Sequence, residues 1–187
     1  TAIATVTSGG LVTAVTAGNT SISYINNSGC SKTVLYTINP LPVAYAVTGT
    51  GSYCAGGTGV AIGLANSQSG VNYQLIRTGT PNVNVGTPVT GTGLAISFGL
   101  QTTAGTYTVA ATNATTGCTA NMTGNAVITV NALPVVTGTL SVCVGSTPQL
   151  SSVTAPNATN PWISANTGVA TIRSEEHTPE LQSRVDI

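Results

Sequence analysis

Short runs in which apolar and polar residues alternate recur along most of the chain, and this pattern predicts β-strands. Thr and Val, which are β-branched and favour extended backbone, are abundant in the runs, and Gly, Asn and Pro separate them. Strong helix formers such as Glu and Lys are scarce. The pattern therefore predicts an all-β protein, with central strands over residues 43–48, 60–65, 71–77, 84–89, 94–98, 106–112 and 126–130.

Seven strands in roughly ninety residues fit one immunoglobulin-like sandwich, which we expect to span residues 41–134. Proline-containing linkers border this unit at both ends. Proline cannot donate to a β-ladder, so the strand pattern is interrupted there. Pro81 and Pro88 flank the fourth predicted strand, which places that strand at a sheet edge. Further strand-like runs occur in residues 1–40 and 135–172.

A repeat with a period of roughly 90 residues connects these parts. Cys30 and Cys118 are 88 residues apart (118 − 30), and Cys54 and Cys143 are 89 apart (143 − 54). The linker sequence Asn-x-Leu-Pro-Val returns after 92 residues (131 − 39). Such a period is typical of sandwiches joined like beads on a string. We therefore predict tandem immunoglobulin-like β-sandwiches, one complete and two truncated.

Charge is almost absent from the first 172 residues. Only 4% of the chain is charged, against about 25% in ordinary globular proteins. Up to residue 172 the only charged side chains are Lys32 and Arg77. Two positive charges make no basic patch, so we expect no nucleic-acid partner. We expect no membrane insertion either, because no apolar run is long enough to span a bilayer as a helix.

Catalytic and metal-binding patterns are missing from residues 1–172. General acid–base catalysis needs a carboxylate, a His, or a tuned Lys, Tyr or Cys, and no pattern places a base beside the Tyr and Cys residues. Zinc sites use closely spaced Cys and His ligands, and calcium sites normally use carboxylates. The Gly clusters match no phosphate-binding motif. We therefore expect no enzyme activity, no metal site and no cofactor.

Two sets of motifs stand out in the flanking parts. They are Ile3-Ala-Thr-Val6, Gly10-Leu-Val-Thr13 and Ile22-Ser-Tyr24, and then Trp162-Ile-Ser-Ala-Asn166 and Val169-Ala-Thr-Ile172. With these motifs the flanking parts resemble bacterial immunoglobulin-like group 2 domains, which occur in surface and adhesion proteins. The resemblance implies that residues 1–40 are the C-terminal part of one such domain and residues 135–172 the N-terminal part of a second.

The central unit has its own motifs, which are Gly51-Ser-Tyr-Cys54, Gly70-Val-Asn-Tyr73, Ala104-Gly-Thr-Tyr107 and Ala114-Thr-Thr-Gly-Cys118. With these motifs it resembles the cysteine-bearing immunoglobulin/PKD-like repeats of very large secreted bacterial proteins, which are often exported by the type IX system. This resemblance implies an extracellular or cell-surface location, neighbouring repeats as partners and no catalytic residues. No export signal is recognisable in the chain.

Cysteines of one exported unit are expected to pair, because the environment is oxidising. Cys54 and Cys118 each lie in a Gly-rich turn of the central unit, so we predict a disulfide between them. Closing a loop of that length is worth about 4 kcal/mol at most. Two buried free thiols are the alternative. Cys30 and Cys143 come from different flanking repeats, and we predict that they stay unpaired within this chain.

Two aromatic residues have expected places in such a sandwich. Tyr107 stands where a tyrosine corner bonds its hydroxyl to nearby backbone, and an ordinary half-buried strand tyrosine is the alternative. Trp162 is expected in the core on an inner strand, in preference to a sugar-stacking platform.

Residues 173–187 differ in composition from the rest of the chain, since they hold all four acids, two arginines and the single His177. The segment from Arg173 to Ser183 resembles one reading frame of a short-read sequencing adapter, with one departure at Pro179. We therefore predict a non-native tail, and a natural charged tail is the alternative.

The repeat, the proline linkers and the missing chemistry predict a non-catalytic structural spacer repeat, and the two resemblances imply that it belongs to a large secreted or surface-anchored bacterial protein. The alternative is an adhesive module that binds a surface glycan or a protein through loops of the central unit. Residues 77–88 are the longest candidate for such a loop.

Overall fold

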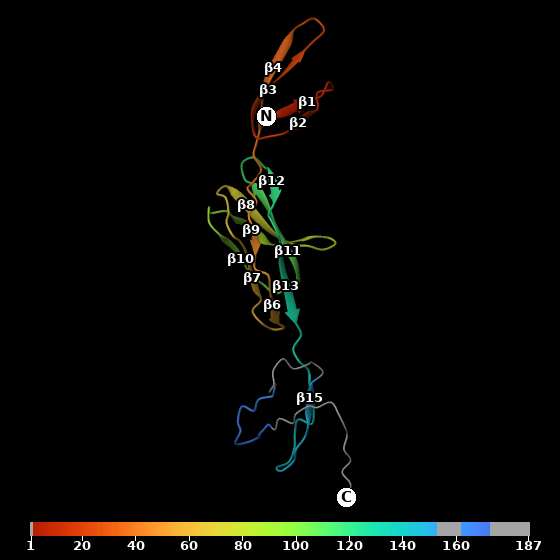
Figure 1. Cartoon of the computed structure of the whole chain (residues 1–187), viewed down its shortest axis with the longest axis vertical. Helices are drawn as coiled ribbons and strands as arrows, with labels where there is room; N and C mark the ends of the chain where they lie inside the picture. The colour runs from red at the N-terminus through yellow and green to blue at the C-terminus, as the bar shows by residue number, and fades with distance from the viewer. Residues whose placement is uncertain (1, 153–161, 173–187) are drawn as a thin grey trace. The chain divides into compact units, whose positions relative to one another are not determined.

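The computed structural model describes residues 2–152 and 162–172 (Figure 1). The chain divides into two compact units, residues 1–132 and 133–187. The described residues form β-strands and turns and contain no helix, so the all-β prediction is confirmed. The finer division predicted at residues 40, 134 and 172 stays a prediction.

Two β-hairpins form the start of the first unit. Strand β1 (Ala4–Val6) pairs antiparallel with β2 (Val12–Ala14), and β3 (Gly18–Ile25) pairs antiparallel with β4 (Ser31–Ile38). None of the described residues 2–40 is buried, and the side chain of Tyr24 in β3 is 74% exposed. These hairpins are therefore held mainly by their backbone ladders.

Residues 43–131 form the central β-sandwich. Most of its strands are short, as is usual for sandwiches of this kind. They are β5 (Val47–Thr48), β6 (Gly51–Cys54), β7 (Val60–Leu64), β8 (Val71–Arg77), β9 (Val83–Thr90), β10 (Ile96–Gln101), β11 (Gly105–Asn113), β12 (Thr119–Asn121) and β13 (Ala126–Asn131).

Two sheets make up this sandwich. The smaller sheet has the order β10–β7–β5, and the larger has the order β6–β13–β11–β8–β9, with β12 paired to β11. Every ladder is antiparallel except that of β6 with β13, which is parallel. Neighbouring β8, β11 and β13 match the sheet of strands C, F and G in immunoglobulin-like sandwiches.

The core lies between the two sheets, and β8 shows how the sequence builds it. Val71, Tyr73 and Leu75 are each 0% exposed, because successive side chains of a strand point to opposite faces and these three share the inner one. The facing sheet contributes Ile62 and Leu64 from β7. The rest of the buried cluster is Tyr107, Val109, Ala111, Met122, Ala126 and Ile128.

The predicted strands agree with the structure best in the middle of the sandwich. The prediction for residues 71–77 is matched by β8 residue for residue. The fourth predicted strand is β9, which follows Pro81 and contains Pro88. It lies at the end of the larger sheet, so its edge position is confirmed. Strands β6 and β12 were not predicted, and the strand predicted over residues 43–48 is reduced to β5.

In the second unit, β14 (Val136–Gly138) pairs antiparallel with β15 (Leu150–Ser152). Trp162 is half-buried and lies outside any strand, so its expected place on an inner strand is wrong. The carbonyl oxygen of Asn166 accepts the N–H groups of Val169 and Ala170, each at 3.1 Å. These bonds close a turn in a part of the chain, residues 135–172, where the sequence pattern had suggested strand-like runs.

Two tyrosine hydroxyls attach the loop between β10 and β11 to the larger sheet. The hydroxyl of Tyr107 donates to the carbonyl oxygen of Thr103 at 2.7 Å, and the side chain is 1% exposed. The tyrosine corner predicted at Tyr107 is therefore confirmed. The hydroxyl of Tyr53 in β6 donates to the next carbonyl back, that of Thr102.

Removing the corner hydroxyl tests its contribution. Tyr107→Phe should lower the free energy of unfolding by about 1–2 kcal/mol, because the carbonyl of Thr103 loses its partner in a buried setting. Tyr24→Phe is the matched control, since that side chain is largely exposed, and it should change stability by only a few tenths of a kcal/mol. Urea unfolding of both variants measures the difference. Equal losses would contradict a structural role for the corner.

Candidate functional site

The described part of the chain offers little charge from which to build a site. Lys32 in β4 and Arg77 in β8 are its only charged side chains, and no acid occurs before residue 173. Among the described residues no group of three or more His, Cys, Asp or Glu side chains could hold a metal ion. None of these residues belongs to a helix long and apolar enough to cross a membrane.

Arg77 covers the surface of the larger sheet with its aliphatic stem. A Cβ atom at Gly105 would lie 3.2 Å from the Cδ atom of Arg77, so this glycine leaves room for the stem. Gly105 faces the stem from β11. Tyr107, two residues further along that strand, is the ladder partner of Arg77. The only cation of the sandwich therefore packs along the sheet, and no acid is present there to pair with it.

Ser67 is the buried polar side chain of the sandwich, and its hydroxyl is fully used. Its Oγ donates to the carbonyl oxygen of Leu94 at 2.6 Å and accepts the N–H of Thr92 at 3.0 Å. It thus ties the loop after β7 to the loop before β10. No buried side-chain nitrogen or oxygen in the described residues lacks a hydrogen-bond partner. This serine is placed to hold loops together, and no base stands beside it.

Tyr73 is a buried phenol whose pKa departs from its ordinary value. Burial raises the pKa of Tyr73 above its ordinary value of 10.0, and the nearby Tyr45 raises it further. The backbone N–H of Gln68, which donates to the phenol oxygen at 2.8 Å, opposes this rise in pKa. A phenol with a raised pKa stays protonated at neutral pH and cannot act as a general base.

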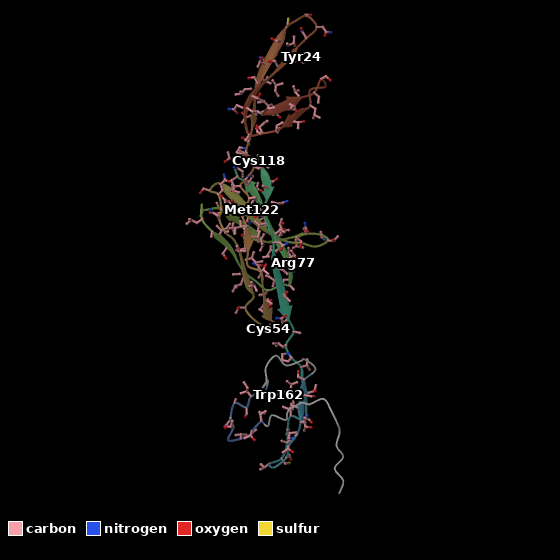
Figure 2. All side chains as sticks on the ribbon, viewed as in Figure 1. Tyr24, Cys54, Arg77, Cys118, Met122 and Trp162 are labelled. Carbon is pink, nitrogen blue, oxygen red and sulfur yellow. The ribbon has the colours of Figure 1, made fainter. Side chains whose placement is uncertain are left out.

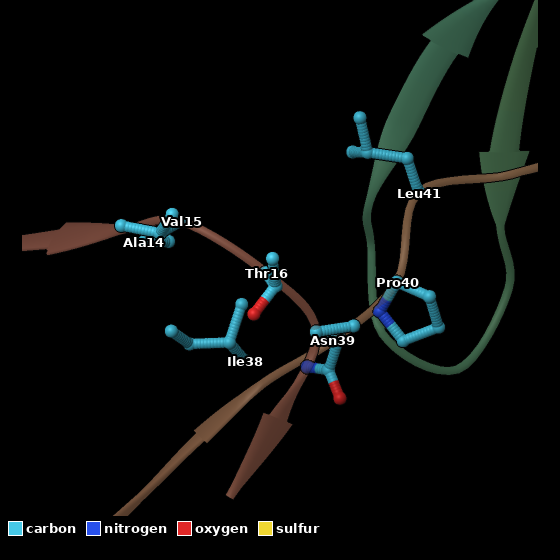
Figure 3. Close-up of a pocket in the computed structure, with 8 residues that line it drawn as sticks. Ala14, Val15, Thr16, Ile38, Asn39, Pro40 and Leu41 are labelled. Carbon is cyan, nitrogen blue, oxygen red and sulfur yellow. The ribbon is translucent and has the colours of Figure 1, made fainter. Parts of the chain in front are cut away.

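Two hollows lie in the N-terminal hairpins. One, of ≈ 380 Å³, is lined by residues 14–17 and 38–41, including Ile38 and Leu41 (Figure 3). The other, of ≈ 420 Å³, is lined by residues 6–10 and 22–25. Neither is lined by a charged side chain. Neither hollow therefore offers a charged group to orient a ligand.

The cysteines of the sandwich lie at its opposite ends (Figure 2). Cys54 closes β6 and is the ladder partner of Asn131, the last residue of β13. Cys118 follows the turn after β11, and its carbonyl oxygen accepts the N–H of Asn113 at 2.9 Å. Both thiols are free, so the predicted Cys54–Cys118 disulfide is wrong for this structure.

The strand register explains why these two cysteines cannot meet. Ile128 of β13 faces Gly105, the first residue of β11, and β13 then runs away from the other end of β11. At about 3.3 Å per residue along these two strands, roughly 35 Å separates the two cysteines. A disulfide needs Cα atoms within about 7 Å of each other. That Cys54 and Cys118 belong to the same sandwich was therefore not sufficient to predict a disulfide between them.

The flanking cysteines occupy similar turns. Cys30 follows the turn of the β3–β4 hairpin, and Cys143 lies in the segment between β14 and β15. Both carry free, exposed thiols in the structure. Their predicted lack of a partner in the chain stays a prediction.

The predicted binding loop is much shorter than expected. Residues 83–88 belong to β9, which leaves residues 78–82 as the connection from β8. The N–H of Gly79 donates to Oδ1 of Asn82 at 3.1 Å and closes this connection. The N–H of Thr78 continues the ladder by donating to the carbonyl of Thr106. The expectation of a long loop over residues 77–88 is therefore wrong.

The tail predicted at residues 173–187 lies outside the described residues.

Comparison with known proteins adds no assignment. No protein-family model matches the chain, and no curated protein is significantly similar to it.

The raised pKa of Tyr73 predicts a dependence of stability on alkaline pH. The folded state holds this proton above pH 10.0 while the unfolded state loses it, so the free energy of unfolding should fall as the pH rises further. The stabilising contribution is fully present below pH 10.0. In an absorbance titration of the native protein, the phenol of Tyr73 should give a late phase, above pH 10.0.

Tyr73→Phe should remove this late phase, and Tyr24→Phe should leave it in place. A late phase that persists without the phenol of Tyr73 would refute the assignment.

Proposed function

We propose that the chain is a non-catalytic structural spacer from a large secreted or surface-anchored bacterial protein, built from tandem immunoglobulin-like repeats. Residues 41–134 are one whole repeat, and residues 1–40 and 135–172 are parts of its neighbours. The partners of each repeat are the adjoining repeats of the same polypeptide, and residues 173–187 are a non-native tail. The location is extracellular or the cell surface.

The observation that carries this proposal is where the chain enters and leaves the sandwich. Before β5, the carbonyl oxygen of Asn39 lies 4.0 Å from Sγ of Cys118, at one end. After β13, Asn131 lies beside Cys54, at the opposite end. A chain that enters and leaves at opposite ends adds length with every repeat. A spacer needs that geometry and requires nothing of the side chains beyond a stable fold.

The turns that carry Cys30 and Cys118 support the repeat. In each turn, an asparagine (Asn26 or Asn113) accepts on Oδ1 the N–H two residues later, at 3.0 and 2.9 Å. A glycine with positive φ precedes each cysteine, at 79° and 72°. The carbonyl oxygen of each cysteine then accepts the N–H of that asparagine, at 3.0 and 2.9 Å. The same local chemistry thus closes the hairpin in both places.

The turns that carry Cys54 and Cys143 correspond in the same way. The carbonyl oxygen of each cysteine accepts the N–H three residues later, at 2.9 and 3.1 Å. The glycine two residues after each cysteine has a φ of 84° or 88°, which favours glycine over residues with a Cβ atom. Together the two pairs of turns support the proposal that residues 1–40 are the back part, and residues 135–172 the front part, of the same type of repeat.

The side-chain chemistry favours a spacer over an enzyme. Within the described residues, side-chain hydroxyl and phenol groups such as those of Ser67 and Tyr107 bond to the backbone, and no carboxylate or imidazole is available before residue 173. An adhesive module that binds a glycan or a protein is the other candidate. Its predicted long loop is a short connection, so the exposed turns would have to supply the contacts.

Lengthening the chain tests the spacer directly. We consider the full chain with a second copy of residues 41–132 inserted after Ala132, which preserves the linker pattern. If each repeat enters and leaves at opposite ends, the maximum dimension measured by small-angle X-ray scattering should grow by roughly 35 Å per added copy. The parent chain under the same conditions is the reference.

An increase below roughly 10 Å would mean that the copies fold side by side, and it would contradict the spacer. Saturable binding of the parent chain to a glycan array or to host cells would favour the adhesive module instead.

A further inference from the structure

The linker asparagine that leaves the sandwich is bound to the segment of Cys54. Asn131 and Cys54 are partners in the parallel ladder of β13 and β6. The carbonyl oxygen of Asn131 also accepts the N–H of Ala55 at 2.8 Å. Neighbouring strands lie about 4.8 Å apart, so the thiol of Cys54 is held within a few ångströms of this linker residue.

The linker asparagine that enters the sandwich lies against Cys118 instead. The carbonyl oxygen of Asn39 is 4.0 Å from Sγ of Cys118. The side chain of Cys118 is half-buried at this end of the sandwich, and Cys54 is exposed at the other.

The two asparagines occupy the same place in the repeat, because each begins the sequence Asn-x-Leu-Pro-Val, 92 residues apart (131 − 39). A linker asparagine between two whole repeats would therefore have two neighbours. One is the cysteine equivalent to Cys54 in the preceding repeat, and the other is the cysteine equivalent to Cys118 in the following repeat. Both cysteines would then lie beside one residue, and a disulfide between them needs a Cα separation of about 4.4–6.8 Å.

We propose that successive repeats are joined by a disulfide from Cys54 of one repeat to the equivalent of Cys118 in the next. This inference rests on the proposed tandem array. The two thiols lose their protons, the S–S bond forms, and the two electrons reduce a disulfide oxidant such as glutathione disulfide to two thiols. The bridge fastens each linker and restricts bending between neighbouring sandwiches.

The proposal also accounts for the four free thiols of this chain. The linker at Asn39 has a cysteine of the Cys118 type beside it, and the linker at Asn131 has one of the Cys54 type. In the described residues neither linker has a cysteine of the Cys54 type and one of the Cys118 type together. Cys30 and Cys143 lie in the equivalent turns of the flanking parts, where each would face a further linker.

The test uses the full chain with a second copy of residues 41–132 inserted after Ala132, with Cys30→Ser and Cys143→Ser throughout. In the facing variant, Cys118→Ser in the first copy and Cys54→Ser in the second leave one thiol on each side of the new linker. In the outer variant, Cys54→Ser in the first copy and Cys118→Ser in the second leave the same two residue types at the far ends. Both variants are oxidised with glutathione disulfide and then analysed by intact mass and thiol alkylation.

The facing variant should lose both reactive thiols and about 2 Da as a monomer, and reduction should reverse the change. The outer variant should keep both thiols open to alkylation or to glutathione. The proposal is overturned if the facing variant keeps its thiols, forms only linked dimers, or oxidises no faster than the outer variant. Small-angle X-ray scattering from the same samples separates the spacer hypothesis from the disulfide hypothesis. A molecule that is lengthened but has no bridge would support the spacer and contradict only the disulfide.

Discussion

The position of β13 between β6 and β11 determines most of what this chain can do. Its antiparallel ladder with β11 and its parallel ladder with β6 direct the chain out of the sandwich beside Cys54. The segment before β5 lies at the other end, beside Cys118. Because both ladders are fixed by backbone hydrogen bonds, the separation of the two ends is a property of the fold. The proposed spacer function and the proposed bridge between repeats both depend on this separation.

The near absence of charge has a structural counterpart. Without acids in the sandwich, polar side chains bond to backbone oxygens and N–H groups, as Ser67 and Tyr107 do. Such bonds fasten loops to sheets and leave the core apolar, with Tyr73 and Leu75 fully buried. The resulting unit is stabilised by burial, by backbone ladders and by these side-chain bonds. A module of this kind can be repeated many times without long-range repulsion between copies.

The sequence predicted those features that depend on local pattern. Strand β8 was predicted correctly because Val71, Tyr73 and Leu75 alternate with polar residues. The corner at Tyr107 was predicted because its partner is only four residues away. Strand β6 was missed because its glycine and serine carry no apolar alternation, and its pairing with β13 joins residues distant in the chain. The prediction of a Cys54–Cys118 disulfide failed for a similar reason. The spacing of the cysteines in the sequence does not show at which end of the sandwich each turn lies.

The separation of the two ends of the sandwich can be measured directly. Spin labels on Cys54 and Cys118, with Cys30→Ser and Cys143→Ser, would report their distance by double electron–electron resonance. The ladder register predicts a distribution centred at roughly 35 Å, broadened by the label linkers. A distance of about 10 Å or less would place both turns at one end of the sandwich, and it would contradict the topology on which the spacer and the bridge between repeats rest.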